Sequence, residues 1–170
     1  GRLAADTNFV TGPRCAPVPG LIQRDKFAGC ADLPGILVDL VQRENVQSVV
    51  LAANWTGYTH EHMLIERDGR RLPLNTKEGI DAFYANLEDH VRLLQGLGAK
   101  VYLVLGVPAH RRFHPGEMIR RSLTDFQIAQ DAGTAVPIVE LQALNAAVDA
   151  KLRTVAEYTG AKLLDPFPDI

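Results

Sequence analysis

Two continuous apolar runs constrain this fold more than any other feature of the sequence. Residues 48–53 read SVVLAA and residues 100–106 read KVYLVLG. Neither run alternates apolar and polar side chains, as a strand with one wet face would. Uninterrupted runs of this length are typical of strands buried on both faces of a parallel sheet. Parallel neighbours need long crossover connections, so the runs also predict helices between them.

Helical patterns occupy the intervals around these strands. Residues 31–44, 76–97 and 137–158 carry apolar side chains at helical spacing. Asp32 is placed to cap the first helix, and Thr76 to cap the second. On the second helix we expect Asp89 and His90 to lie on the solvated face.

Shorter signals complete the alternation of helices and strands. Residues 8–11 and 162–165 are two further strand candidates. Within residues 63–74, Asp68-Gly69 stands between extended segments and predicts a short hairpin insertion. The order of helices and strands implies right-handed crossovers and an α/β sandwich of helices on a mostly parallel sheet.

Composition bounds the class of protein. The chain has 170 residues, with 46% hydrophobic and 22% charged residues, which is typical of a single globular domain. A net charge of -2 argues against nucleic-acid binding and against a polybasic membrane surface. No apolar run approaches the roughly 20 residues that span a bilayer, and the first ten residues lack a signal-peptide pattern. We therefore expect a soluble unit whose targeting element, if any, lies outside it.

The two cysteines suggest a compartment. Cys15 and Cys30 both lie in a polar, loop-like stretch, where a disulfide would stabilise the fold by about 3 kcal/mol in the chain-entropy model. Such bonds persist in oxidising compartments, so the pair favours a periplasmic or extracellular setting. Two buried thiols remain the alternative. A zinc site is disfavoured, because no C-x-x-C partner exists.

Ligands of open parallel sheets bind beyond the carboxyl ends of the strands, so residues 54–62 and 107–115 form the expected functional rim. Asn54 follows the first strong strand directly, and its amide could donate to a developing oxyanion. An Asx-turn is the alternative role. Trp55 and Tyr58 are either lid aromatics of the core or a substrate platform.

Other chemistries find little support at this rim. Its four histidines have spacings that suit a metal, but solvated loop side chains explain them better, and we predict no metal; they are His60, His62, His110 and His114. No phosphate-binding or dinucleotide loop follows a strand, so no cofactor is expected. Ser48 and Ser122 are the only serines, and neither lies in a nucleophile motif. The 170 residues contain no complete catalytic triad.

Taken in order, five segments resemble a known family. They are TGPRCAPVPG, a Cys before a helix, VVLAANWTGY, VYLVLGVPAHRRFHP and LLDPFPDI. This series resembles the SGNH-type domain appended to acyltransferase family three membrane proteins, which O-acetylate bacterial surface glycans. The resemblance covers nearly the full 170 residues and implies a three-layer sandwich with a flavodoxin-like sheet.

The resemblance also implies an incomplete catalytic set. The family's nucleophilic serine belongs to a G-D-S-H segment ahead of residue 1, and its acid and base to a D-x-x-H segment after residue 170. We therefore expect residues 1–170 to be one SGNH-like domain, incomplete at both ends and inactive alone. The roles carried over to this sequence are the oxyanion hole for Asn54 and Gly12, and substrate binding for Trp55, Tyr58, His110 and Arg111.

The expected function follows from these implied roles. The chain would be the extracytoplasmic domain of a membrane-anchored bacterial O-acyltransferase. Its partners would be an acyl donor, a carbohydrate acceptor and the membrane acyltransferase domain of the same polypeptide. The alternative is a non-catalytic glycan-binding or partner-docking module with a degenerate SGNH fold.

Overall fold

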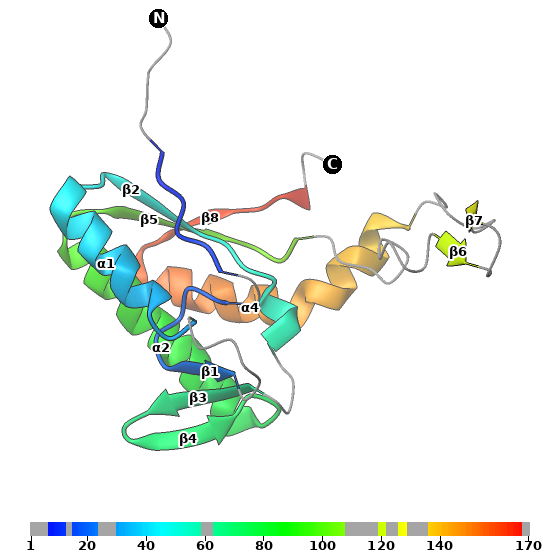
Figure 1. Cartoon of the computed structure of the whole chain (residues 1–170), viewed down its shortest axis with the longest axis horizontal. Helices are drawn as coiled ribbons and strands as arrows, with labels where there is room; N and C mark the ends of the chain where they lie inside the picture. The colour runs from blue at the N-terminus through cyan, green and yellow to red at the C-terminus, as the bar shows by residue number, and fades with distance from the viewer. Residues whose placement is uncertain are drawn as a thin grey trace, which may run out of the picture.

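A computed structural model of the chain describes seven stretches: residues 7–12, 15–23, 30–58, 63–107, 119–121, 126–128 and 136–167. Within them the chain forms an α/β structure with one parallel and two antiparallel sheets (Figure 1). No helix of these stretches is long and apolar enough to cross a membrane.

The two apolar runs form neighbouring parallel strands, as predicted. Strand β2 (Ser48–Leu51) pairs with β5 (Lys100–Val104), and β5 pairs in parallel with β8 (Lys162–Leu164). Val49 lies opposite Val101 in this register. The sheet order β2-β5-β8 follows the order of the chain, with one helix before each strand.

Three helices occupy the predicted intervals. They are α1 (Leu33–Glu44), α2 (Lys77–Gly96) and α4 (Ile138–Thr159). The Thr76 hydroxyl accepts a hydrogen bond from the Gly79 backbone N–H at 3.1 Å, which satisfies one of the free donors at the start of α2. Asp32 stands at the N-cap of α1 but makes no side-chain capping bond.

The two faces of the parallel sheet differ in burial. Val49 and Leu51 of β2, like Val101 and Leu103 of β5, belong to the core cluster that also contains apolar residues of α2 and α4. Val50, which points to the opposite face, is 56% exposed. The described residues thus confirm the α/β class and the parallel sheet. The three-layer, flavodoxin-like layout stays a prediction for the intact domain.

A second sheet packs against α2. The predicted hairpin is confirmed as β3 (Met63–Arg67) and β4 (Arg70–Pro73), joined by a turn in which Asp68 and Gly69 both have positive φ. The short strand β1 (Leu21–Gln23), which the sequence analysis did not predict, pairs antiparallel with β3. The sheet order is β1-β3-β4.

Two further predictions need correction or addition. Residues 8–11, predicted as a strand, have no regular secondary structure and no ladder partner within the described chain. A strand needs a neighbour to satisfy its backbone groups, and apolar composition alone does not supply one. The strands β6 (Ile119–Arg121) and β7 (Phe126–Ile128) form a small antiparallel pair that was not predicted.

Candidate functional site

Asn54 lies where the sequence predicts it, just beyond the carboxyl end of β2. The chain turns there into a short 3-10 helix, η1 (Trp55–Tyr58), and the Gly57 N–H donates to the Asn54 backbone carbonyl at 2.9 Å. The Thr56 hydroxyl donates to the Asn54 side-chain oxygen at 3.1 Å. This bond orients the exposed amide with Nδ2 as its donor atom. A Cβ atom added at Gly57 would lie 3.0 Å from Nδ2, so glycine leaves room for the amide.

Gly12 lies in a tight contact with the start of α1. A Cβ atom at this position would lie 2.8 Å from Leu33 Cδ1 and 2.9 Å from Cys15 Sγ, so any larger residue would displace the turn. The Cys15 N–H donates to the Gly12 carbonyl at 3.2 Å and closes that turn. Gly12 is therefore required by packing, independently of any role of its backbone N–H in an oxyanion hole.

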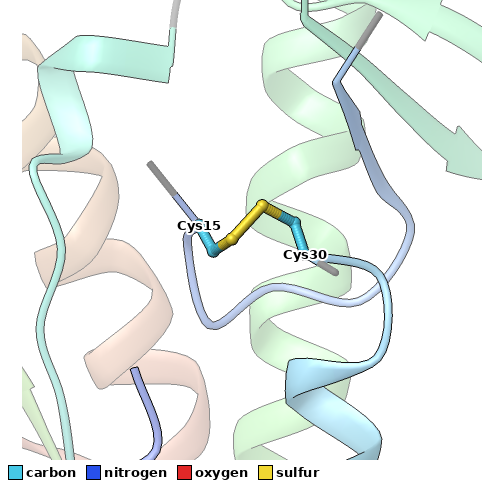
Figure 2. Close-up of a disulfide and its surroundings, with 2 residues drawn as sticks. All are labelled: Cys15 and Cys30. Atoms are coloured by element: carbon cyan, nitrogen blue, oxygen red, sulfur yellow. A yellow bond between two sulfur atoms is a disulfide. The ribbon is translucent and has the colours of Figure 1, made fainter. Parts of the chain in front are cut away.

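A disulfide holds this turn in place. Cys15 and Cys30 are bonded, with their Cα atoms 5.0 Å apart, as Figure 2 shows. The bond ties the coil after Gly12 to the loop that leads into α1, and Cys30 is buried. The disulfide is thereby confirmed over the alternative of two separate thiols.

Gly12 and Asn54 line one open groove of about 1930 Å³. Its walls include residues 7–12, the leucines of α1, and β2 together with the residues that follow it as far as Asn54. Since α1 runs back to β2 through a turn of only three residues, the start of α1 lies near the carboxyl end of β2. Gly12, packed on Leu33, is therefore at the same end of the groove as Asn54.

Trp55 lies beneath this end of the groove, and Tyr58 lines the groove with a side chain that is mostly buried. Trp55 is 2% exposed, and its indole N–H donates to the Val104 carbonyl of β5 at 2.8 Å. Tyr58 is buried and stacks on Phe83, with ring centroids 6.2 Å apart. Burial raises the pKa of the Tyr58 hydroxyl. These contacts favour the core-aromatic alternative that the sequence left open.

Helix α4 holds the exit of the neighbouring strand β5. The Asp149 carboxylate accepts from the Gly106 N–H at 2.7 Å, and the Asn145 amide donates to the Val107 carbonyl at 3.2 Å. A Cβ atom at Gly106 would lie 2.6 Å from Asn145 Cγ. Burial, and then the nearby Asp149 charge, raise the pKa of Tyr84.

The sequence analysis missed these two anchoring residues. A signal was available, because Asn145 interrupts the apolar stripe of the third helix between Leu141 and Val148. An amide on a buried stripe must find a hydrogen-bond partner, and here the partner is the outgoing strand.

One expectation on α2 is wrong. His90 was placed on a solvated face, but it is 2% exposed, and its Nε2 has no hydrogen-bond partner in the described structure. Burial lowers its pKa to about 4, so the ring is neutral at pH 7. Its neighbour Asp89 is exposed and bonded to Arg67, as a solvated face requires.

The remaining rim residues fall outside the described part of the chain. These are the expected substrate contacts His110 and Arg111, and the other rim histidines His60, His62 and His114. Among the residues that are described, no group of three or more metal-ligating side chains comes together.

The comparisons with known proteins agree with the motif series. A family model described as an SGNH domain fused to AT3 domains matches residues 3–170. No curated protein and no solved structure matches the chain. The match spans almost the whole sequence, and the chain therefore belongs to the SGNH domain family that is fused to AT3 acyltransferase domains.

Proposed function

We propose that this chain is the extracytoplasmic domain of an O-acyltransferase that transfers acyl groups to a carbohydrate hydroxyl. Family membership supports an acyltransferase-associated module with a membrane acyltransferase domain in the same polypeptide. The observation that carries the proposal is the Asn54 amide, oriented by Thr56 at the carboxyl end of β2 and lining an open groove. The disulfide supports an oxidising compartment.

The proposed chemistry passes through a tetrahedral intermediate. A serine Oγ attacks the carbonyl of the acyl donor, a histidine takes the proton, and the donor's leaving group departs to give an acyl-serine. A carbohydrate hydroxyl then attacks the acyl-serine, gives up its proton and releases the serine. The Asn54 Nδ2–H and the Gly12 N–H donate to the oxyanion in both steps.

The triad itself is assigned to segments of the intact protein outside residues 1–170. The one described serine, Ser48, opens β2 at the opposite end of the strand from Asn54, so it does not serve as the nucleophile. In this proposal His110 and Arg111 shape the carbohydrate entrance, Tyr58 forms part of the groove wall, and buried Trp55 supports the site from below.

The test is Asn54→Ala in the full-length polypeptide. If Asn54 supplies an oxyanion donor, kcat for ester hydrolysis and acyl transfer falls by about 100- to 1000-fold, because the lost bond is strongest in the transition state. KM changes little. Gln47→Ala, an exposed substitution on the same turn-strand unit, is the matched control. An Asn54→Ala enzyme with unchanged kcat would contradict the assigned role.

A second candidate function is a glycan-binding module without catalysis. It is favoured by the position of Ser48, which leaves the described residues without a serine near Asn54. Saturable glycan binding by the full-length protein, with no turnover of acyl ester or acyl donor, would select this function over acyl transfer.

A further inference from the structure

The four residues from Asn54 to Gly57 differ in what they face. Asn54 and Gly57 line the groove, whereas Trp55 and Thr56 are not among the described residues of its wall. Trp55 is buried and Thr56 is partly buried. A substrate in the groove therefore contacts the Asn54 amide, and an effect of Trp55 or Thr56 on the reaction passes through Asn54.

The indole of Trp55 completes the hydrogen bonding of β5 at the point where β2 ends. In a parallel ladder, alternate residues of a strand bond to the same neighbour. The Lys100 N–H donates to the Gln47 carbonyl at 3.0 Å, so Lys100 and Val104 both direct their backbone groups toward β2. Strand β2 ends at Leu51, before the position that would supply a backbone donor to the Val104 carbonyl. The Trp55 indole N–H donates to this carbonyl instead, at 2.8 Å, and ties the outgoing chain to β5.

The exposed Asn54 amide needs a second restraint, because the position of the backbone does not fix its rotation. Exposed side chains change rotamer within picoseconds to nanoseconds, and a half-turn of the amide would place an oxygen where the donor N–H stands. The Thr56 hydroxyl donates to Oδ1 at 3.1 Å, which opposes this rotation and polarises the amide as a donor. A Cβ atom on the groove-lining Gly57 would lie 3.0 Å from Nδ2 and 3.6 Å from Oδ1. The nitrogen is thus the amide atom nearer to this part of the groove wall.

We propose that Trp55 and Thr56 are positioning residues for the oxyanion donor, an assignment that rests on the proposed function. Trp55 fixes where the chain leaves the sheet, and Thr56 fixes the rotation of the Asn54 amide. Such donors act because they are preorganised where charge develops, and a displacement of about 1 Å costs about 100-fold in rate. The contribution of Trp55 is its indole N–H, and its ring is not a substrate platform.

Thr56→Val in the full-length polypeptide tests the first restraint on the amide. This change keeps the branched shape and removes the hydroxyl. We expect kcat for acyl transfer to fall about tenfold at an unchanged KM, because Thr56 acts on the transition state through Asn54. Thr56→Ser keeps the hydroxyl and should return kcat to within about twofold of the unmodified enzyme. The matched control is Thr154→Val, which removes a hydroxyl that donates to the Ala150 carbonyl of α4 at 3.0 Å, and kcat should not change.

Two outcomes would overturn the role of Thr56. One is an unchanged kcat in Thr56→Val, in an enzyme whose kcat does fall with Asn54→Ala. The other is a loss that Thr56→Ser fails to restore, because a loss caused by altered packing would not depend on the hydroxyl.

Trp55→Phe tests the anchoring of the outgoing chain. It keeps an aromatic ring in the core and removes the indole N–H, so we expect kcat to fall about tenfold at an unchanged KM. Val91→Ala is the control for lost stability. Val91 is buried about two turns along α2 from Phe83, which stacks on Tyr58. With both variants assayed well below their unfolding midpoints, an equal loss of kcat in Val91→Ala would overturn the role of Trp55.

A double-mutant cycle tests whether the two residues act through Asn54. In an Asn54→Ala background, Trp55→Phe and Thr56→Val should each lower kcat by less than about twofold, because the donor that they position is already absent. A further tenfold loss in this background would show independent action and overturn the proposal.

Nuclear magnetic resonance of the same full-length protein, with isotopically labelled asparagine, separates positioning from chemistry. The Asn54 side-chain NH₂ signals are assigned by their loss in Asn54→Ala. We expect an ordered amide that becomes mobile on the picosecond-to-nanosecond timescale in Thr56→Val and stays ordered in Thr154→Val. Equal mobility with and without the Thr56 hydroxyl would overturn the positioning. If the order depends on Thr56 while Asn54→Ala leaves kcat unchanged, the positioning of the amide stands and the acyl-transfer proposal falls.

Discussion

The two principal sheets of this chain differ in how their strands are held in place. In the antiparallel sheet β1-β3-β4, the Asn86 side chain of α2 links β3 to the residues just before β1, because its Nδ2 donates to the Pro19 and Glu66 carbonyls, both at 2.9 Å. The Asn86 Oδ1 accepts from Arg67 at 2.7 Å. Among the described residues, the parallel sheet has no strand on the outer side of β2, and Val50 on one of its faces is exposed.

The difference separates a region held together by a buried side-chain amide from one whose outer strand has no second neighbour among the described residues. A buried amide with every donor and acceptor satisfied holds its neighbours in one arrangement. Gly20 packs against the same hydrogen bonds. Its φ is +77°, and a Cβ atom there would lie 2.5 Å from the Glu66 carbonyl oxygen. The candidate site, with Asn54 and Gly12, lies in the groove beside β2 instead.

The largest change in stability is expected when the Asn86 side chain is removed. Asn86→Ala leaves two partly buried carbonyls without this donor, removes one Arg67 contact and takes away a buried side chain, so we expect a loss of about 4 kcal/mol in unfolding free energy. Urea unfolding, followed by the fluorescence of the single Trp55, measures it. Asp89→Asn, at the exposed end of the same network, is the control and should cost little. Equal losses in the two variants would show that the Asn86 hydrogen bonds do not hold β3 and the residues before β1 together.

Loss of the disulfide should lower the unfolding free energy by a smaller amount, and the structural change should centre on the groove beside β2. Cys15→Ser combined with Cys30→Ser removes a cross-link between residues 15 apart in sequence, which corresponds to about 3 kcal/mol. Reduction of the unmodified protein should lower the unfolding free energy by the same amount. Hydrogen exchange should rise around Gly12 and leave β3 and β4 unchanged. Faster exchange throughout the antiparallel sheet would mean that the two regions are coupled.

Proline substitutions compare the two edges of β2. Val49→Pro removes an N–H that bonds to β5 and should cost about 2 kcal/mol more than Val50→Pro, whose N–H faces the open edge. The difference is expected in the 170-residue chain, measured by urea unfolding. Similar costs in the 170-residue chain would contradict the open edge.

The smallest effect concerns the buried histidine of α2. Burial lowers the folded-state pKa of His90 to about 4, below the unfolded value of 6.5, so the unfolded chain takes up the proton first as the pH falls. The stability is complete above about pH 6.5 and decreases toward pH 4. Between pH 7 and pH 5.5 we expect a loss of about 1 kcal/mol. His90→Leu should flatten this part of the profile, and an unchanged slope would show that His90 does not cause it.

Local periodicity accounts for most of what could be predicted. The three helices and the strands β2, β5 and β8 appear in the predicted order, and the Asp68-Gly69 turn appears as a hairpin. Each of these patterns lies within about 20 consecutive residues, so the chain itself displays it.

Partners distant in sequence could not be read in this way. Strand β1 has only three residues and exists because β3, about 40 positions later, pairs with it. Residues 8–11 have strand-like composition but no partner within the described structure, and so they form no strand. The burial of His90 and Asn86 was also hidden, because the antiparallel sheet and α4 cover faces of α2 that its own pattern does not reveal.

For the candidate site, the sequence by itself determined that a polar amide follows a buried strand and that two cysteines flank a loop. Tertiary structure alone decided that Asn54 and Gly12 share a groove, that Trp55 supports the rim from within the core, and that β2 has β5 as its one neighbour among the described strands. The physical reason is that strand periodicity is a local property of the chain. Hydrogen-bond satisfaction depends on which distant segments meet, and only the folded arrangement settles that.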